Sequence, residues 1–305
     1  MTPIRSLPAL AEHVRALGTR TRIAVAAAED PNTITSIARA VSEGFAEAIL
    51  LGAKERIEQV CALAGIDPAR FQIIDLGPDS DVSGEAVRLV RSGEADVLMK
   101  GLVGTDKFLK AVLNKEKGLL PPKAVMSYVC ALELPKYRKL LFISDTAVLP
   151  YPDLEQKVAM LNYSVQMARR FGIDQPKVAL ITASEKVTAG LPNTFDHALI
   201  AKMAQRGQIK NCVVDGPLDV FLACDPAAGG IKGVSTPIAG EADILIFPSL
   251  EAANAFYKGL MLFAGGELAG LIQGTLKPVV VMSRSESAAS KYYSVALSCL
   301  MAGEK

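Results

Sequence analysis

The sequence predicts an α/β fold with mostly parallel sheets. Short runs rich in Val, Ile and Leu alternate with segments of helical periodicity along the whole chain, and most of these runs are apolar at every position. A strand that is apolar on both faces is typical of a parallel sheet covered by helices on both sides. The chain has 305 residues, a length that suits about two such domains, and half of the residues are hydrophobic.

The first half of the chain begins with a helix and then alternates strands and helices. Ser6 is typical of a helix N-cap and Gly18 of a helix end, and Asp30-Pro31 opens the next helix with a cap and a first-position proline. The helices are expected at 6–18, 31–42, 54–64, 84–91 and 105–113, and the strands at 22–27, 48–51, 72–76 and 96–99. Two further apolar runs, 124–130 and 139–144, have no clear helix between them.

The second half repeats the alternation. Its helices are expected at 153–171, 194–205, 250–263 and 286–300, and its strands at 178–182, 212–215, 244–247 and 279–282. The strand at 139–144 leads into the proline-containing loop 150–152, which is typical of a joint between domains. We therefore expect a first domain of residues 1–142 and a second domain that starts at residue 143.

Composition and charge exclude several classes of partner. Lys and Arg total 33 against 32 for Asp and Glu, with no basic run, so neither a nucleic acid nor an anionic membrane is an expected partner. No apolar stretch reaches the roughly 18 residues of a membrane span. Charged residues at Arg5, Glu12 and Arg15 stand where a signal peptide needs an apolar core, so we expect a cytoplasmic location.

Familiar catalytic and metal motifs do not occur. The five cysteines are widely spaced and only two histidines exist, which argues against disulfides and against a metal site. The chain has no phosphate-binding P-loop, no nucleophile elbow and no zinc-protease motif. His197 lies inside a helical pattern, which favours a structural role. The glycine-rich segment 265–270 with Gly274 fits either a close approach of backbone to a phosphate or tight turns.

Polar side chains follow four of the predicted strands. They are Lys100, Ser144, Asp145, Asp215, Ser283 and Arg284. Open α/β sheets bind their ligands at the carboxyl ends of the strands. The pair Ser283 and Arg284, just before a helix, suits an anion, because helix N–H groups and the guanidinium fork both donate to phosphate oxygens. The four strand ends together predict one anion-binding cleft, but no particular reaction.

These residues lie in stretches that resemble the phosphate acetyltransferase and phosphate butyryltransferase family. The stretches are, in order, residues 215–218 (DGPL), 239–244 (AGEADI), 254–259 (NAFYKG), 277–279 (KPV) and 283–284 (SR). Residues 98–103 (LMKGLV) with Thr105, and residues 145–148 (DTAV) followed by 153–155 (DLE), look like the butyryl branch. The resemblance extends from about residue 20 to about residue 300.

The resemblance implies an activity, a fold and an assembly. Acyl-CoA plus phosphate is interconverted with acyl phosphate plus CoA, by direct transfer in a ternary complex. CoA is a substrate, and neither a tightly bound cofactor nor a metal is expected. The fold would be similar to that of isocitrate/isopropylmalate dehydrogenase, with two α/β domains and the active site in the cleft between them. Residues 280–305 would rejoin the first domain, which leaves 143–279 as the second, and the chain would form a homodimer.

The resemblance also implies roles for individual residues. Arg284 would bind the phosphate dianion, Ser283 would stabilise the oxyanion formed at the thioester carbonyl, and Glu286 would accept the proton of the CoA thiol. The expected substrate-binding residues are Lys100, Thr105, Lys110, Ser144, Asp145, Asp215, Asn254, Tyr257 and Lys258.

Departures from the acetyl branch favour a longer acyl group such as butyryl. An Asp of that branch falls at Ser290, a second Asp falls at Phe221, and an Arg falls near Lys110. Glu286 is the nearest replacement base, although a first-turn Glu also fits the helix dipole alone, and Lys110 also fits a solvated helix face.

Three alternatives stay open at this point. A phosphate acetyltransferase acting mainly on acetyl-CoA shares most of the motifs. A metal-dependent dehydrogenase shares the fold, although two scattered histidines count against it. A non-catalytic protein that binds acyl-CoA or acyl phosphate would explain the missing Asp at Ser290.

Overall fold

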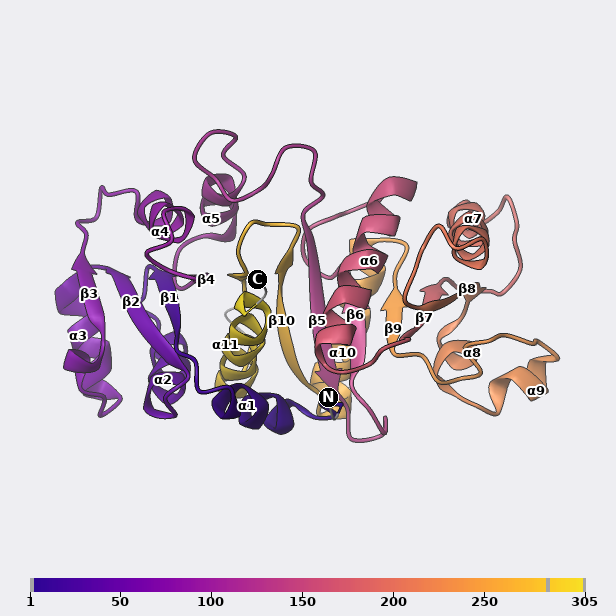
Figure 1. Cartoon of the computed structure of the whole chain (residues 1–305), viewed down its shortest axis with the longest axis horizontal. Coiled ribbons are helices and arrows are strands. Elements are labelled where there is room, and N and C mark those ends of the chain that lie inside the picture. Colours follow the sequence, from indigo (N-terminus) through magenta and orange to yellow (C-terminus); the bar gives the residue numbers. More distant parts are fainter. Residues whose placement is uncertain (1–2, 284–285, 304–305) are drawn as a thin grey trace. The chain divides into compact units, whose positions relative to one another are not determined.

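The computed structural model describes residues 3–283 and 286–303 and confirms an α/β fold with mostly parallel strands. The chain divides into two compact units. Figure 1 labels most of the helices and strands of both. Unit 1 comprises Met1–Ser6 and Ser127–Glu267, and unit 2 comprises Leu7–Met126 and Leu268–Lys305.

Unit 2 is built on strands in the order β3-β2-β1-β4-β11-β10. The bounds are β1 Thr21–Ala26, β2 Ala46–Gly52, β3 Gln72–Asp75, β4 Val97–Lys100, β10 Glu267–Gln273 and β11 Val279–Val280. The first five strands in this order are parallel, and β10 pairs antiparallel with β11. All residues of β4 are buried, both the apolar run Val97–Met99 and Lys100 at its end.

Helices cover these strands, and strands and helices alternate along the chain as the sequence predicted. The bounds are α1 Leu7–Ala16, α2 Pro31–Ser42, α3 Lys54–Leu63, η1 Pro68–Arg70, α4 Val82–Arg91, α5 Thr105–Val112 and α11 Ala288–Ala302. Helix α2 begins as predicted: the Asp30 carboxylate accepts a hydrogen bond from the Thr33 N–H at 2.8 Å, and Pro31 occupies the first position. Helix α11 packs against α2 and α1, and α4 packs against α5.

Unit 1 has strands in the order β5-β6-β9-β7-β8. The bounds are β5 Ser127–Glu133, β6 Leu141–Ser144, β7 Lys177–Ile181, β8 Val213–Leu218 and β9 Ile244–Ile246. Its helices are α6 Leu154–Arg170, α7 Asn193–Gln205, α8 Val220–Cys224, α9 Ala228–Lys232 and α10 Leu250–Ala264. Strands β6, β9, β7 and β8 run parallel, and β5 is antiparallel to β6. Helix α6 packs on β5, β6 and β9, and α7 packs on β8.

The division into units differs from the predicted domain boundaries at 142 and 279. Strands β5 and β6 pair antiparallel with four residue pairs in register, so both belong to unit 1, and the division falls before Ser127. At the other end the chain passes to unit 2 at Leu268, within β10, and not near residue 280. The C-terminal helix α11 belongs to the same unit as β1–β4.

The glycine-rich segment is a turn followed by a buried strand. Gly265 ends α10 with a φ of 63°, and Gly274 follows β10 with a φ of 87°. Between them β10 is buried from Leu268 to Gln273. The turns and the tight packing of the second interpretation are present, whereas approach of this backbone to a phosphate stays a prediction. The strand itself was not predicted, because glycine weakens a strand pattern.

Within the described residues, no helix combines the length and the apolar character that crossing a bilayer requires.

Candidate active site

The carboxyl ends of β4 and β11 meet at one edge of the unit 2 sheet. These strands are parallel neighbours with Val280 opposite Met99, so Lys100 ends its strand beside the segment that leads from β11 to Ser283. The structure thus brings Lys100 and Ser283, which the sequence had singled out separately, to the same sheet edge. Ligands of α/β sheets bind at such edges.

Lys100 is held by a tight turn. Its side chain is buried, and the Nζ atom donates to the Gly101 carbonyl oxygen at 3.3 Å. A Cβ on Gly101 would lie 2.1 Å from the Ala27 carbonyl oxygen, so only glycine fits. The N–H groups of Gly101 and Leu102 donate to Ala26 and Ala27 at 2.9 and 2.7 Å. A cation removed from water in this way gains from an anionic ligand.

Helix α5 begins four residues after Gly101. Its N-cap is Gly104, which provides no side-chain hydrogen bond to the first turn, and Thr105 is the first helical residue. N–H groups at a helix start attract anions. Thr105 and Lys110 are both exposed. For Lys110 this exposure agrees with a solvated helix face, and contact with a substrate stays a prediction.

Ser283 and Glu286 lie shortly before α11 and are linked through their backbones. Ser283 is exposed and Glu286 is half-buried, and the Glu286 N–H donates to the Ser283 carbonyl oxygen at 3.2 Å. Ser287 then caps α11 by accepting from the Ser290 N–H at 2.9 Å. Arg284 lies outside the described residues, so its role as the phosphate ligand stays a prediction.

Ser290, at the position of the acetyl-branch Asp, binds the backbone of β10. It is fully buried, and its Oγ atom accepts a hydrogen bond from the Leu268 N–H at 3.2 Å. One turn later the Ser294 Oγ atom accepts from the Gly270 N–H at 3.0 Å. These two hydroxyls bind N–H groups of β10 as a neighbouring strand would. The sequence shows only serines at helical spacing, so this function was not foreseen.

In unit 1, Ser144 and Asp145 are tied to the protein itself. Asp145 is buried and accepts four hydrogen bonds, from Ser127 Oγ and Tyr128 N–H at 3.0 Å, and from Ala147 and Val148 N–H at 2.8 Å. Burial raises the pKa of this carboxyl above its usual value although these donors oppose the shift. Ser144 Oγ lies 3.1 Å from Ser127 Oγ and donates to Tyr128 at 3.0 Å.

These contacts favour a role in holding the turn 145–148 at the end of β6. Direct contact of Ser144 or Asp145 with a substrate stays a prediction.

Helix α10 is connected to this turn. The Asn254 Nδ2 atom donates to the Thr146 carbonyl oxygen at 2.9 Å, next to Asp145. Tyr257, one turn later, is buried, whereas Lys258 is exposed. The structure therefore groups Asn254 with the turn after β6 and leaves Lys258 at the surface.

Asp215 is half-buried inside β8, opposite Ala179. Its Oδ2 atom accepts from Thr236 Oγ1 at 2.5 Å and its Oδ1 atom from the Gly216 N–H at 2.9 Å. A Cβ on Gly216 would lie 2.5 Å from the Leu180 Cβ, so glycine is required beside it. Thr236 orients the carboxylate, and no signal in the sequence had marked it.

A buried polar cluster joins α6 to α7. Lys157 is 1% exposed, and its Nζ atom donates to Asn193 Oδ1 at 2.7 Å and to Asp196 Oδ2 at 2.6 Å. Burial, followed by the charge of Lys157, lowers the pKa of His197 to about 4. His197 is therefore neutral near pH 7, which supports its structural interpretation. Among the described residues, no three His, Cys, Asp or Glu side chains form a group that could hold a metal ion.

Polar side chains at the carboxyl edges of parallel strands are typical of α/β proteins that bind small molecules at the edge of the sheet. A family model described as phosphate acetyl/butaryl transferase matches residues 78–299. The chain belongs to this family and is an acyltransferase.

Relatives of both branches are similar over most of the chain. A phosphate butyryltransferase of Clostridium beijerinckii is 43% identical over 281 residues, which cover 92% of this chain and 93% of that protein. A phosphate acetyltransferase of Thermotoga maritima is 40% identical over 287 residues, covering 94% and 97%. The crystal structure of a branched-chain phosphotransacylase from Enterococcus faecalis matches with a TM-score of 0.82 and 28% identity, covering 93% of this chain and 100% of that one.

Proposed function

We propose that the chain interconverts a short-chain acyl-CoA, such as butyryl-CoA, and phosphate with acyl phosphate and CoA. The observation that carries this proposal is that buried Lys100 ends β4 beside the segment that leads from β11 to Ser283, at one edge of the unit 2 sheet, with the Glu286 N–H bonded to the Ser283 carbonyl oxygen. A fixed cation, a hydroxyl and a carboxylate are the groups that this transfer needs. Membership of the acyltransferase family supports the same conclusion.

Each group has a defined task in the proposed reaction. Lys100, with the predicted ligand Arg284, holds the phosphate dianion. One phosphate oxygen forms a bond to the thioester carbonyl carbon, and Ser283 donates to the oxygen that becomes negative. The C–S bond then breaks and CoA leaves as the thiolate. In the reverse direction Glu286 accepts the thiol proton before sulfur attacks the acyl phosphate and phosphate leaves.

Direct transfer in a ternary complex is part of the proposal. No acylated residue is needed, because holding both substrates in attacking geometry supplies much of the rate. The isocitrate/isopropylmalate dehydrogenase-like arrangement, with an active site in a cleft between domains, stays a prediction from the resemblance. So do the cytoplasmic location, the homodimer, and action without a metal or a tightly bound cofactor.

Acetyl transfer is the second candidate. The relative from T. maritima, named a phosphate acetyltransferase, is nearly as similar as the butyryltransferase of C. beijerinckii. Burial of Ser290 against β10 favours the butyryl assignment, since the position of the acetyl-branch Asp is unavailable for a base.

Substitution of Lys100 tests the site. We expect Lys100→Met to lower kcat/KM for phosphate-dependent CoA release by roughly 10²–10³-fold, the range found when one charge-stabilising donor is removed. Lys107→Met, at an exposed position of α5, is the matched control and should stay within about twofold. Equal losses in both variants, or none in Lys100→Met with the circular dichroism unchanged, would place the reaction elsewhere.

A further inference from the structure

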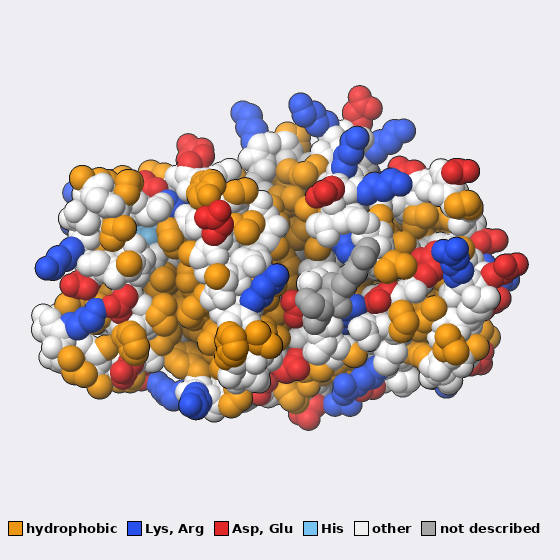
Figure 2. Space-filling view, turned by 180° about the vertical axis from the view of Figure 1, so that it is seen from behind, with side chains coloured by type: hydrophobic (Ala, Val, Ile, Leu, Met, Phe, Trp, Pro, Cys, Tyr) orange, Lys and Arg blue, Asp and Glu red, His pale blue; other side chains and the backbone are white. Residues whose placement is uncertain are grey.

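A buried ion pair joins the start of α11 to the start of α2. Figure 2 shows Lys and Arg side chains projecting from one face of the protein, where such residues normally meet water. Lys291 is instead only 4% exposed, and its Nζ atom donates to the Asp30 Oδ2 atom at 2.8 Å. Burying an ammonium group is costly unless a well-placed partner compensates for the lost water. The location of this pair therefore points to a function that outweighs the cost.

Asp30 is held in place by its own helix. Its Oδ2 atom also accepts from the Thr33 N–H and the Thr33 hydroxyl, at 2.8 and 2.5 Å, as the cap of α2. Burial raises the pKa of Asp30, but hydrogen bonds from Lys291 and Thr33 lower it by more, so the carboxylate is charged near pH 7. Lys291 thus meets a fixed negative charge, and this contact is more rigid than one between two mobile surface side chains.

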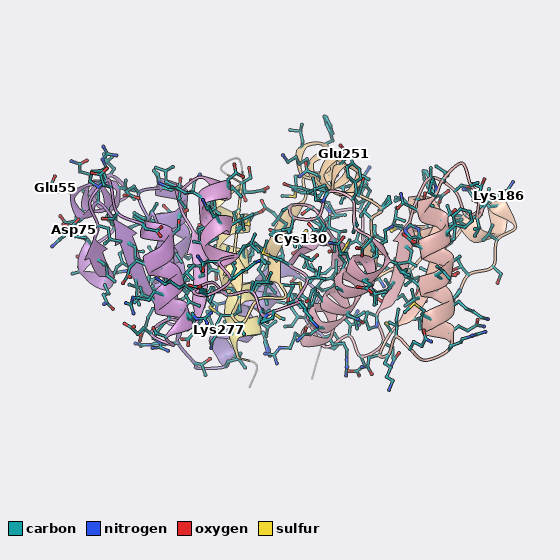
Figure 3. The ribbon with its side chains drawn as sticks, turned by 90° about the horizontal axis from the view of Figure 1, so that it is seen from above. Glu55, Asp75, Cys130, Lys186, Glu251 and Lys277 are labelled. Atoms are coloured by element: carbon teal, nitrogen blue, oxygen red, sulfur yellow. The ribbon has the colours of Figure 1, made fainter. Side chains whose placement is uncertain are left out.

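The first turn of α11 has further bonds, to α2 and to β10. The Ser36 hydroxyl of α2 lies 3.1 Å from the carbonyl oxygen of Ala288, the first residue of α11. The Ser290 Oγ atom accepts from the Leu268 N–H of β10 at 3.2 Å. In Figure 3 the yellow ribbon of α11 lies among the violet elements of unit 2, close to Lys277. The start of α11 is therefore fixed to two neighbouring elements of the same unit.

This turn directly follows the segment that the proposed reaction uses. On one side of that segment, β11 is paired with β4, the strand that ends in Lys100. On the other side, Ser287 caps α11. Ser283 and Glu286 lie between these two ends and are joined by a backbone hydrogen bond. Because the sheet fixes the first end, a shift in the start of α11 would displace Ser283 and Glu286 relative to Lys100.

We propose that Asp30 and Lys291 are positioning residues for the reaction: their ion pair holds the start of α11 against α2 and so sets the positions of Ser283 and Glu286 relative to Lys100. This inference rests on the acyl transfer proposed above. The two residues act through the segment before α11 and not on the substrates themselves. A displacement of about 1 Å at a reacting group can lower the rate by roughly 10²-fold, so a distant contact of this kind affects turnover.

Steady-state kinetics of phosphate-dependent CoA release test the pair. Lys291→Met keeps the length of the side chain without its charge, and Asp30→Asn keeps an acceptor for the Thr33 N–H. Each variant should lower kcat by roughly 10²-fold, and the double variant no more than either, because all three lack the same contact. Each should also raise the KM for phosphate severalfold, since the segment before α11 carries the predicted phosphate ligand Arg284. Partial unfolding alone would lower kcat and leave this KM unchanged.

A second contact between the same two helices provides the matched control. The Tyr292 hydroxyl, one residue after Lys291, donates to the Glu43 Oε2 atom at 2.5 Å, next to the end of α2. Tyr292→Phe removes this bond but leaves the ion pair, so kcat and the KM for phosphate should stay unchanged. Equal kinetic effects in Tyr292→Phe, losses that multiply in the double variant, or an unchanged KM for phosphate in Lys291→Met and Asp30→Asn would overturn the proposal.

Hydrogen exchange measured by mass spectrometry gives a test that does not depend on turnover. Lys291→Met should speed amide exchange in peptides that cover residues 281–290, whereas peptides from α4 should exchange as in the unaltered protein. Unchanged exchange at 281–290 would overturn the anchoring of this segment by the pair. An unaltered protein that releases no CoA with phosphate would instead refute the proposed function, and hydrogen exchange would still decide whether the pair fixes the segment.

Discussion

Ser290 offers the sharpest test of the structural argument, because its hydroxyl replaces a strand partner for β10. Substituting Ser290→Ala removes the acceptor of the Leu268 N–H, and Leu268 is 2% exposed, so water does not readily replace it. A buried donor left without an acceptor costs about 1–3 kcal/mol of unfolding free energy. Urea unfolding followed by circular dichroism measures this loss.

Two serines on the same helix serve as controls. Ser294→Ala should cost a similar amount, since Ser294 Oγ accepts from the Gly270 N–H. Ser298→Ala should cost less than about 1 kcal/mol, because its Oγ atom donates to the Val295 carbonyl oxygen and, unlike Ser290 and Ser294, is not the acceptor of a β10 N–H group in the described hydrogen bonds. An unchanged unfolding midpoint in Ser290→Ala would refute the assigned role.

The acetyl-branch residue can be restored directly at this position. Ser290→Asp places a carboxylate where the native side chain is fully buried, and burying that charge costs several kcal/mol. We therefore expect a loss of stability and no gain in acetyl-CoA turnover. A stable Ser290→Asp variant with raised acetyl transfer would show that this position reaches the reacting groups.

Further predictions concern Gly101 at the sheet edge, the buried His197 and the half-buried Asp30. Gly101→Ala should strongly lower activity and the thermal midpoint, since its Cβ would lie 2.1 Å from the Ala27 carbonyl oxygen; normal activity would show that the turn can open. The pKa of His197 is lowered to about 4 in the folded protein, against about 6.5 in the unfolded chain, so neutral His197 stabilises the fold above pH 6.5 and this stability is lost as the pH falls toward 4. Urea titrations at different pH values should show a loss of about 3 kcal/mol in unfolding free energy, which His197→Phe largely removes. Equal pH dependence of stability in both proteins would contradict this. Burial raises the pKa of Asp30, but hydrogen bonds from Lys291 and Thr33 lower it by more, so the net shift is downward. The Asp30 carboxylate therefore stabilises the fold above its unfolded pKa, and this stability is lost as the pH falls through its folded pKa. Lys291→Met should weaken the pH dependence of the unfolding free energy at acid pH, and an unaltered dependence would rule the pair out as its cause.

The sequence predicted the regular elements well where their patterns were strong. The expected helix 31–42 has the observed bounds, with Asp30 as its cap, because capping and proline placement act within a few residues. Strand β8 extends further than predicted, through Gly216-Pro217 to Leu218, since glycine and proline argue against a strand. Strand β10 was missed for the same reason.

Partners distant in the sequence could not be predicted. The helical pattern around Ser290 does not indicate that it meets Leu268, and the sequence around Asp215 gives no sign of its bond to Thr236. The resemblance marked Ser144 and Asp145 as site residues, whereas the structure shows that their polar atoms are bonded within the protein. Such contacts depend on how strands are ordered in a sheet, which local patterns do not fix.

The central claim is phosphate-dependent acyl transfer, and a thiol-release assay on the purified protein tests it most directly. Butyryl-CoA is supplied with and without phosphate in the presence of EDTA, with acetyl-CoA in parallel. We predict CoA release that requires phosphate, survives EDTA and is faster with butyryl-CoA. No release with either substrate would contradict the claim and favour a binding protein, and release abolished by EDTA would favour a metal-dependent enzyme.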